Sequence, residues 1–243
     1  MRSALPQKEE SGVTIMENLL KKIYASEQPE NKSQYRILQF IKLLALINML
    51  GFYVIYNYHA AEGLLSVWQA TTGFIIWQKF SIWTLILSFG MTFTQCSRHL
   101  LWGASLVFLG SIITFTTHFR FPDNAVYYGV FTFLGVAMLV VHIFHWWLKK
   151  APGSCGWLLC AIAYDLTRHL TDGVIVWQGK VIGHVASVLY NGWMTWLGFP
   201  DKTFSSLEYV PFLPNIFLFL CGVYLFQFMT EHEKGRYYLE KLR

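Results

Sequence analysis

Residues 125–148 read AVYYGVFTFLGVAMLVVHIFHWWL and contain no aspartate, glutamate, lysine or arginine. A helix needs about 20 mostly apolar residues to cross the roughly 30 Å of hydrocarbon in a bilayer. This stretch is therefore long enough to span a membrane, and apolar stretches recur from about residue 37 to residue 230. We predict an all-α fold, a polytopic transmembrane helix bundle with about six spans, near residues 37–57, 74–96, 99–118, 125–148, 154–171 and 209–230.

The composition agrees with one membrane domain. Of the 243 residues, 54% are hydrophobic and 14% are charged, against roughly 25% charged in an ordinary soluble domain. We predict a polar tail over residues 1–35, a transmembrane domain over residues 36–230 and a charged tail over residues 231–243. The net charge of +5 gathers near the ends of the spans and forms no nucleic-acid-like patch, so we expect membrane lipids and no nucleic acid as partners.

The lysines and arginines test this count of spans, because cytoplasmic loops of membrane proteins are enriched in them. The two tails, Arg98 and the pair Lys149-Lys150 all fall on one side when the spans alternate. We therefore expect both termini on the cytoplasmic side, most simply in a cytoplasmic (inner) membrane, with a mitochondrial inner membrane as the open alternative. Residues 64–72 and 181–199 are semi-apolar, and we expect interfacial or re-entrant segments there.

The N-terminal tail contains a short amphipathic pattern within residues 13–25. Met16, Leu19, Leu20 and Ile23 recur at helical spacing. Such a helix lies on the membrane surface or docks on another protein. Other membrane subunits are thus expected partners, through residues 13–25 and the aromatic flanks of the spans.

Ionisable residues in or near the spans are the first candidates for function, because charge is costly in a bilayer. His59 and Glu62, near the outer end of the first span, share a face if the helix continues, and the carboxylate would then orient an imidazole that acts as a general base. An interfacial polar cap is the alternative interpretation. Lys42 lies near the start of the same span, where it can extend to the cytoplasmic interface.

Two further clusters have structural and functional interpretations. His142 and His145 lie three residues apart before the Trp146-Trp147 pair. We interpret them either as a metal or haem site or as part of an interfacial belt. The run from Asp165 to Asp172, DLTRHLTD, forms either ion pairs along a helix or a polar pocket that faces the outer compartment.

Several segments together resemble the membrane acetyltransferase domain of heparan-alpha-glucosaminide N-acetyltransferase and its short prokaryotic relatives. Trp196-Leu197-Gly198 precedes residues 204–214, FSSLEYVPFLP, and then Gly222, where the family has a WLG element, a run S-x-D-Y-F-P-L-L-P-W and a glycine-bearing helix. Residues 128–137, YGVFTFLGVA, resemble the family pattern F-G-I-L-H-F-I-G-V-A, Lys79 precedes Gly90 by eleven residues, and Tyr58-His59 matches an aromatic-His pair.

This resemblance implies transfer of an acetyl group from cytoplasmic acetyl-CoA to a sugar or envelope polymer, a glycan acceptor, across the membrane. It makes His59 and Glu62 the expected catalytic residues and Lys79, Thr132 and Glu208 the expected cofactor-binding residues. Thr132, Glu208 and Lys79 replace a histidine, an aspartate and an arginine of the family, and its Asp-x-x-Arg-Gly element is absent from the first span. Two hypotheses follow: an active acyltransferase that uses acetyl-CoA, or a pseudoenzyme, a catalytically inactive relative that acts as an accessory subunit of a membrane complex.

Overall fold

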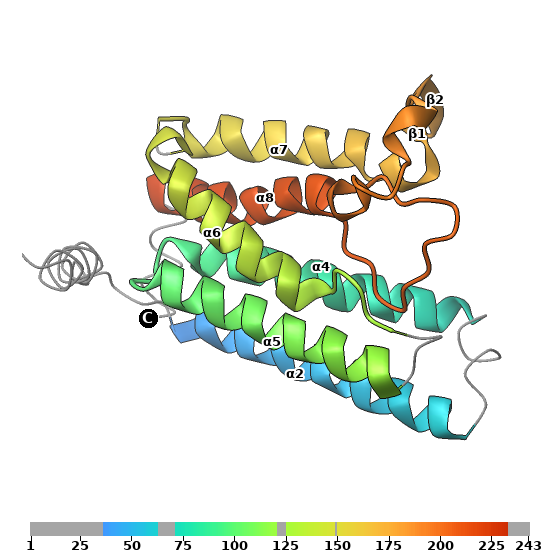
Figure 1. The fold of residues 1–243 in the computed structure, drawn as a ribbon. Coiled ribbons are helices and arrows are strands. Elements are labelled where there is room, and N and C mark those ends of the chain that lie inside the picture. Colours follow the sequence, from blue (N-terminus) through green and yellow to red (C-terminus); the bar gives the residue numbers. More distant parts are fainter. Residues whose placement is uncertain (1–35, 63–70, 121–124, 149, 233–243) are drawn as a thin grey trace, which may run out of the picture. The chain divides into compact units, whose positions relative to one another are not determined.

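The computed structural model describes residues 36–62, 71–120, 125–148 and 150–232. The expected amphipathic helix at 13–25, most of the segment 64–72 and nearly all of the C-terminal tail lie outside these ranges. Within them the chain is mostly helical, as predicted (Figure 1). The α-helices are α2 (Arg36–Ala61), α4 (Thr72–Phe93), α5 (His99–Arg120), α6 (Val130–Leu148), α7 (Gly153–Thr167) and α8 (Phe212–Glu231).

Five of these helices, α2, α4, α5, α6 and α8, are long and apolar enough to cross a membrane. The helix at the expected fifth span, α7, has only 15 residues. It begins after Pro152 and ends at the charged run that starts near Asp165, so its apolar part is shorter than the sequence count assumed. The prediction of a transmembrane helix bundle is thus confirmed, with five helices that could cross a membrane and a sixth, shorter helix at the place of the expected fifth span.

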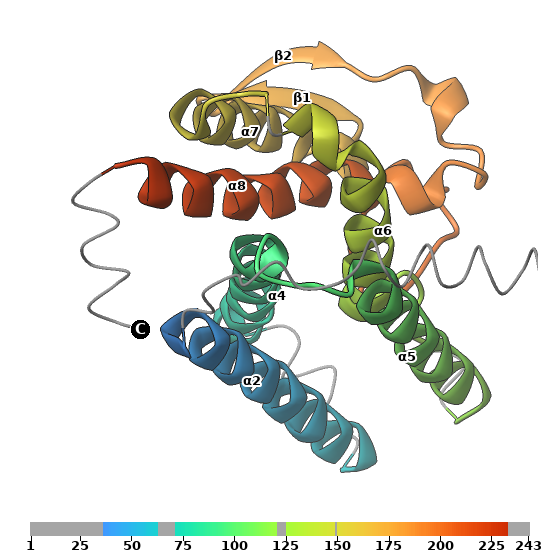
Figure 2. The ribbon, with the colours of Figure 1, turned by 90° about the vertical axis from the view of Figure 1, so that its left-hand side faces the viewer.

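The helices pack mainly as neighbouring pairs, α2 with α4, α4 with α8, α7 with α8, and α5 with α6 (Figure 2). Glycines allow the closest of these approaches. A Cβ on Gly90 of α4 would overlap the carbonyl oxygen of Phe219, and a Cβ on Gly222 of α8 would lie 2.5 Å from the carbonyl oxygen of Leu87. The α4–α8 contact therefore depends on backbone meeting backbone, as in small-residue contacts of membrane helices.

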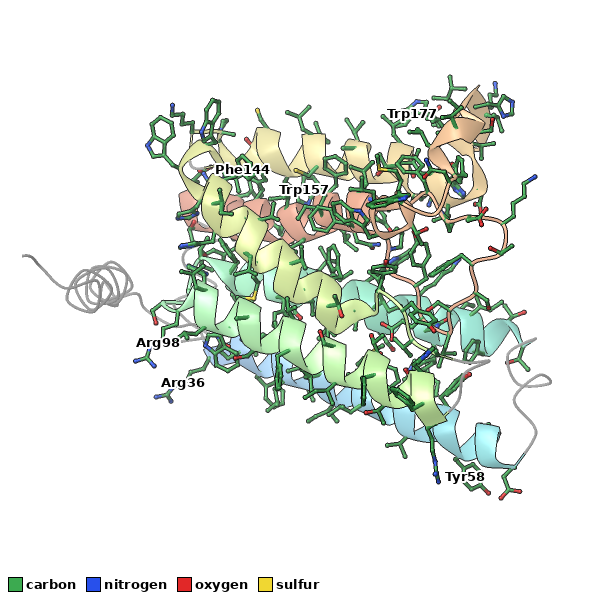
Figure 3. All side chains as sticks on the ribbon, in the orientation of Figure 1. Arg36, Tyr58, Arg98, Phe144, Trp157 and Trp177 are labelled. Atoms are coloured by element: carbon green, nitrogen blue, oxygen red, sulfur yellow. The ribbon has the colours of Figure 1, made fainter. Side chains whose placement is uncertain are left out.

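The two ends of the bundle differ in chemistry. Figure 3 shows Arg36 and Arg98 at one end and Tyr58 and Trp177 at the opposite end. Leu38, near the start of α2, packs against Phe226, near the end of α8, so these helices begin and end on the same side. We call this side the basic end and the opposite one the hairpin end.

The hairpin end contains a small antiparallel sheet that the sequence did not predict. Strands β1 (Val174–Trp177) and β2 (Lys180–His184) pair with Trp177 opposite Lys180. The two turn residues, Gln178 and Gly179, both have positive φ, 47° and 77°, as a two-residue hairpin turn requires. Part of the segment expected to be interfacial or re-entrant is therefore a hairpin, followed by the short 3-10 turns η3 (Ser187–Leu189) and η4 (Thr195–Leu197).

Candidate functional site

Glu208 lies at the centre of the polar contacts near the hairpin end. Its side chain is only 1% exposed, and one carboxylate oxygen accepts a hydrogen bond of 2.8 Å from the backbone N–H of Val130, the first residue of α6. The other oxygen accepts a hydrogen bond from the hydroxyl of Tyr53 on α2. Burial raises the pKa of Glu208 to about 7, although both hydrogen bonds act in the opposite direction. The carboxylate thus joins α2 to the start of α6.

The backbone around Glu208 is held by the segment that precedes α6. The N–H of Leu207 donates to the carbonyl of Ala125 at 3.1 Å, and the N–H of Val210 donates to the carbonyl of Tyr128 at 3.0 Å. Tyr128 has a positive φ of 55°, which is uncommon for a residue other than glycine and is typical of constrained sites. The two stretches that carry the family resemblance therefore lie side by side.

A second set of polar contacts joins α2 to α4. The amide of Asn48 donates to the hydroxyl of Ser81 at 2.6 Å, and the indole N–H of Trp77 donates to the Asn48 carbonyl oxygen at 3.1 Å. Ser81 is fully buried. The Asn48 side chain thus holds α2 and α4 together.

His59 and Glu62 lie at the hairpin end of α2. The His59 ring is half-buried and edge-on to Tyr58, with centroids 5.7 Å apart. Glu62 is exposed just beyond the helix, and its N–H continues the helical pattern to the carbonyl of Tyr58. In the described part of the chain no ion pair joins the two side chains. Their assignment as base and orienting carboxylate stays a prediction.

Lys79 lies in a cavity of about 400 Å³ at the hairpin end, which we call the hairpin-end cavity. It lies between α4, α7 and the start of α8. The charged residues of the Asp165–Asp172 run and the proline-rich run before α8 meet there, and the lining comprises Lys79, Ile82, Trp83, Tyr164, Arg168, His169, Thr171, Asp172, Tyr209, Val210, Pro211, Pro214 and Asn215. Part of the run therefore lines a polar pocket, and the ion pairs that were the alternative interpretation, Arg168 with Asp165 and His169 with Asp172, are present as well.

Thr132, which stands where the family has a histidine, lies elsewhere. It is half-buried on α6 and packs so closely on Gly110 of α5 that a Cβ there would overlap its hydroxyl. It also lines an apolar cavity of about 230 Å³ with Tyr128, Phe133 and Trp196 among others. Its contacts are mainly those of helix packing.

Lys42 lines a cavity of about 460 Å³ near the basic end. Its ammonium lies 5.3 Å from the centroid of the Phe89 ring, so the side chain turns toward α4 instead of running along α2 to the interface. The lining of this basic-end cavity is Gln39, Lys42, Leu46, Phe89, Thr92, Phe93, Gln95, Cys96, Ser97, Trp102, Leu106, Leu109, Phe131 and Met138.

Three histidines gather at the basic end. The centroid of the His99 ring lies 4.3 Å from that of the tilted Phe93 ring. The His99 centroid is 5.2 Å from the centroid of His142 and 6.5 Å from that of His145. Among the residues that the structure describes, no group of three or more His, Cys, Asp or Glu could hold a metal ion. The nearby Lys150 ammonium lies 3.6 Å from the Trp146 ring centroid, which agrees with the interfacial-belt interpretation.

The five predicted site residues do not meet at one point. Glu208 is enclosed between α2 and α6, Lys79 faces the hairpin-end cavity, Thr132 faces α5, and His59 and Glu62 end α2. The sequence missed Tyr53, because nothing in an apolar helix distinguishes a tyrosine that binds a remote carboxylate from one at the interface. Asn48 could have been found, because an amide inside an apolar span requires partners.

Comparison with known proteins identifies the family of the chain. A family model described as "Heparan-alpha-glucosaminide N-acetyltransferase, catalytic" matches residues 35–243. No curated protein and no solved structure matches the chain. The matched region covers the six α-helices of the described residues, the three cavities and the Glu208 contacts. The chain therefore belongs to the heparan-alpha-glucosaminide N-acetyltransferase catalytic-domain family.

Proposed function

We propose that the chain is an active transmembrane acyltransferase, which takes an acetyl group from acetyl-CoA at the basic end and transfers it to an amino or hydroxyl group of a sugar at the hairpin end. The family match over residues 35–243 carries this proposal. The basic end would face the cytoplasm, in agreement with the positive-inside rule, and the protein would lie in a cytoplasmic membrane.

The chemistry of the basic end supports a role in donor binding. Acetyl-CoA carries several negative charges, and Arg36 and Arg98 lie at this end of the bundle (Figure 3). The basic-end cavity then offers a single cation, Lys42, above a mostly apolar lining. A mostly apolar cavity with a few polar groups is typical of small-molecule sites, and we propose that this one holds the pantetheine arm of acetyl-CoA.

The hairpin-end cavity supports a role in acceptor binding. Its aromatic side chains, Trp83, Tyr164 and Tyr209, offer flat surfaces for a sugar ring, while Asp172 and Thr171 offer oxygens to its hydroxyl groups. Apolar walls with a few polar groups of fixed direction are typical of small-molecule sites. The charges of both signs suit a ligand rich in hydrogen-bonding groups.

The proposed reaction requires a base at the acceptor. His59 would accept the proton of the attacking amine or hydroxyl, a bond would form to the acetyl carbon, and the carbon–sulfur bond would break to release coenzyme A as the thiol. Glu62 would orient the imidazole. Glu208, enclosed by protein, would act as a positioning residue that fixes α2 against α6 through Tyr53.

The test uses the full chain in proteoliposomes with labelled acetyl-CoA and glucosamine as the acceptor probe. We expect labelled N-acetylglucosamine from the wild type and a loss of at least about a hundredfold in His59→Ala, since general-base catalysis contributes about that much. His184→Ala is the matched control, because His184 is exposed on β2. Equal rates in the two variants would refute the role of His59.

The same preparation separates the two hypotheses stated from the sequence. Binding of acetyl-CoA, measured by equilibrium dialysis, supports the enzyme even if glucosamine is the wrong acceptor. Absence of acetyl-CoA binding together with stable co-purification of other membrane subunits would instead establish the catalytically inactive accessory subunit. Lys42→Met should weaken acetyl-CoA binding if the donor enters through the basic-end cavity.

A further inference from the structure

The hairpin-end cavity changes in polarity with depth. Its charged side chains lie toward the hairpin end, whereas Ile82, Trp83 and Tyr164 lie about one turn further into the bundle. On α4 the step from Lys79 to Trp83 is four residues, which is about 6 Å along the helix axis. A ligand that fits this gradient has a polar head at the hairpin end and an apolar part directed toward the middle of the membrane.

The cavity is continuous with the lipid-facing surface of α4. Trp83 lines the cavity and is nevertheless 40% exposed, and its neighbours Ile76 and Phe80 are 63% and 61% exposed. Helices α4 and α7 pack on α8 from two sides, as Figure 2 shows, and are not themselves a closely packed pair. Trp83 and Tyr164 form an edge-on contact between them, with ring centroids 6.2 Å apart.

The charges at the head of the cavity favour a phosphate. In the described ranges Lys79 forms no ion pair, while the Arg168 guanidinium lies 3.2 Å from Asp165 and His169 lies 3.3 Å from Asp172. The start of α8 also lines the cavity and has neither an acidic residue in its first turn nor a side-chain cap. A helix N-terminus beside two cations attracts an anionic group.

We propose that the acceptor is membrane-bound: a lipid whose phosphate carries a sugar or sugar-alcohol head, with the phosphate at Lys79 and Arg168 and the chain along Trp83 between α4 and α7. This proposal rests on the proposed function and names its acceptor class. It also gives Lys79 a role at the acceptor, instead of the role in cofactor binding that the family resemblance implied.

The first experiment separates a lipid acceptor from a soluble one. Membrane vesicles from cells that produce the full chain are incubated with labelled acetyl-CoA and then extracted with chloroform and methanol. We expect label in the organic phase and a decrease of about tenfold or more in Lys79→Gln, which loses a charge-assisted contact. Lys79→Arg should retain the labelling, and Lys202→Gln, an exposed lysine outside the cavity, should leave it unchanged. Label confined to the aqueous phase would overturn the proposal.

The second experiment does not depend on catalysis. Purified protein is exposed to nanodiscs with phosphatidylinositol, to nanodiscs with phosphatidylcholine, and to free inositol phosphate, and bound ligand is measured by native mass spectrometry. The site is supported if the wild type retains phosphatidylinositol and neither of the other two probes. This retention should be lost in Lys79→Gln and in the cavity-filling Ile82→Trp, and it should be kept in the lipid-facing control Ile76→Trp. If phosphatidylinositol is retained in this way but no acetyl label is transferred, the proposed acyltransferase function is refuted and the lipid-binding site is supported. The proposal would be overturned if no label enters the organic phase and the protein either retains all three probes equally or retains none of them.

Discussion

Replacement of Glu208 by glutamine tests whether a buried ionisable carboxyl joins α2 to α6. The pKa of Glu208 rises from 4.5 to about 7 on burial. The folded protein therefore keeps this proton up to about pH 7, whereas the unfolded chain loses it near pH 4.5. The folded state binds more protons in this window, so the contribution of Glu208 to stability is complete below pH 4.5 and is lost as the pH rises through about 7.

The size of the effect follows from the shift. A change from 4.5 to about 7, at about 1.4 kcal/mol per unit, amounts to about 3 kcal/mol. Glutamine stays neutral and keeps an acceptor oxygen for Tyr53 or Val130, so the free energy of unfolding of Glu208→Gln relative to wild type should increase by about 3 kcal/mol from about pH 4.5 to about pH 8. Thermal unfolding of the purified protein in detergent micelles, followed by tryptophan fluorescence across this range, measures the difference.

A second variant sharpens this measurement. Tyr53→Phe removes a hydrogen bond that favours the ionised form of Glu208, so the loss of stability should continue to higher pH than in the wild type. If the curves of Glu208→Gln and wild type run parallel from about pH 4.5 to about pH 8, the buried carboxyl does not titrate as inferred.

Two other substitutions test the packing of the helices, both by thermal unfolding in the same detergent. Gly222→Ala should destabilise the protein by about 1–3 kcal/mol because the new methyl group meets the Leu87 carbonyl. Gly51→Ala is the control: its new methyl group has no atom within 4 Å, so the substitution should be neutral or slightly stabilising. Similar losses of stability in the two variants would contradict the role of Gly222. Asn48→Ala should cost about 1–3 kcal/mol because it leaves a buried hydroxyl without its donor, and an unchanged unfolding temperature would show that this network adds no stability.

Much of the fold could be predicted from the sequence, because apolar length and the positions of lysine and arginine are strong signals in membrane proteins. The stretch 125–148 gave one span directly, although its first residues, 125–129, are not helical and form hydrogen bonds with residues 206–210. The hairpin at β1 and β2 escaped prediction because its valines, isoleucine and tryptophan have the same composition as a short apolar or interfacial segment. Only the positive φ values of Gln178 and Gly179 distinguish the two.

The candidate site could be predicted less completely. The family resemblance selected Glu208 and Lys79, and these residues have the most distinctive surroundings of the predicted five. The sequence could not give the partner of Glu208, since Tyr53 is 155 positions away along the chain and contacts of this kind depend on how tilted helices cross. The meeting of Lys79 with Arg168 and Asp172 likewise depends on α8 lying between α4 and α7.

The 15 residues of α7 correspond to about 22 Å of helix, against a hydrocarbon core of roughly 30 Å. A surrounding bilayer accommodates such hydrophobic mismatch by thinning locally, at a cost of a fraction of a kcal/mol per Å. Thinning beside α7 would draw headgroups down toward Trp83 and Tyr164, and would make thin membranes the preferred host of this protein. Reconstitution in lipids of increasing chain length should therefore lower the thermal stability of the protein, and we expect α7 to be the first helix to unfold.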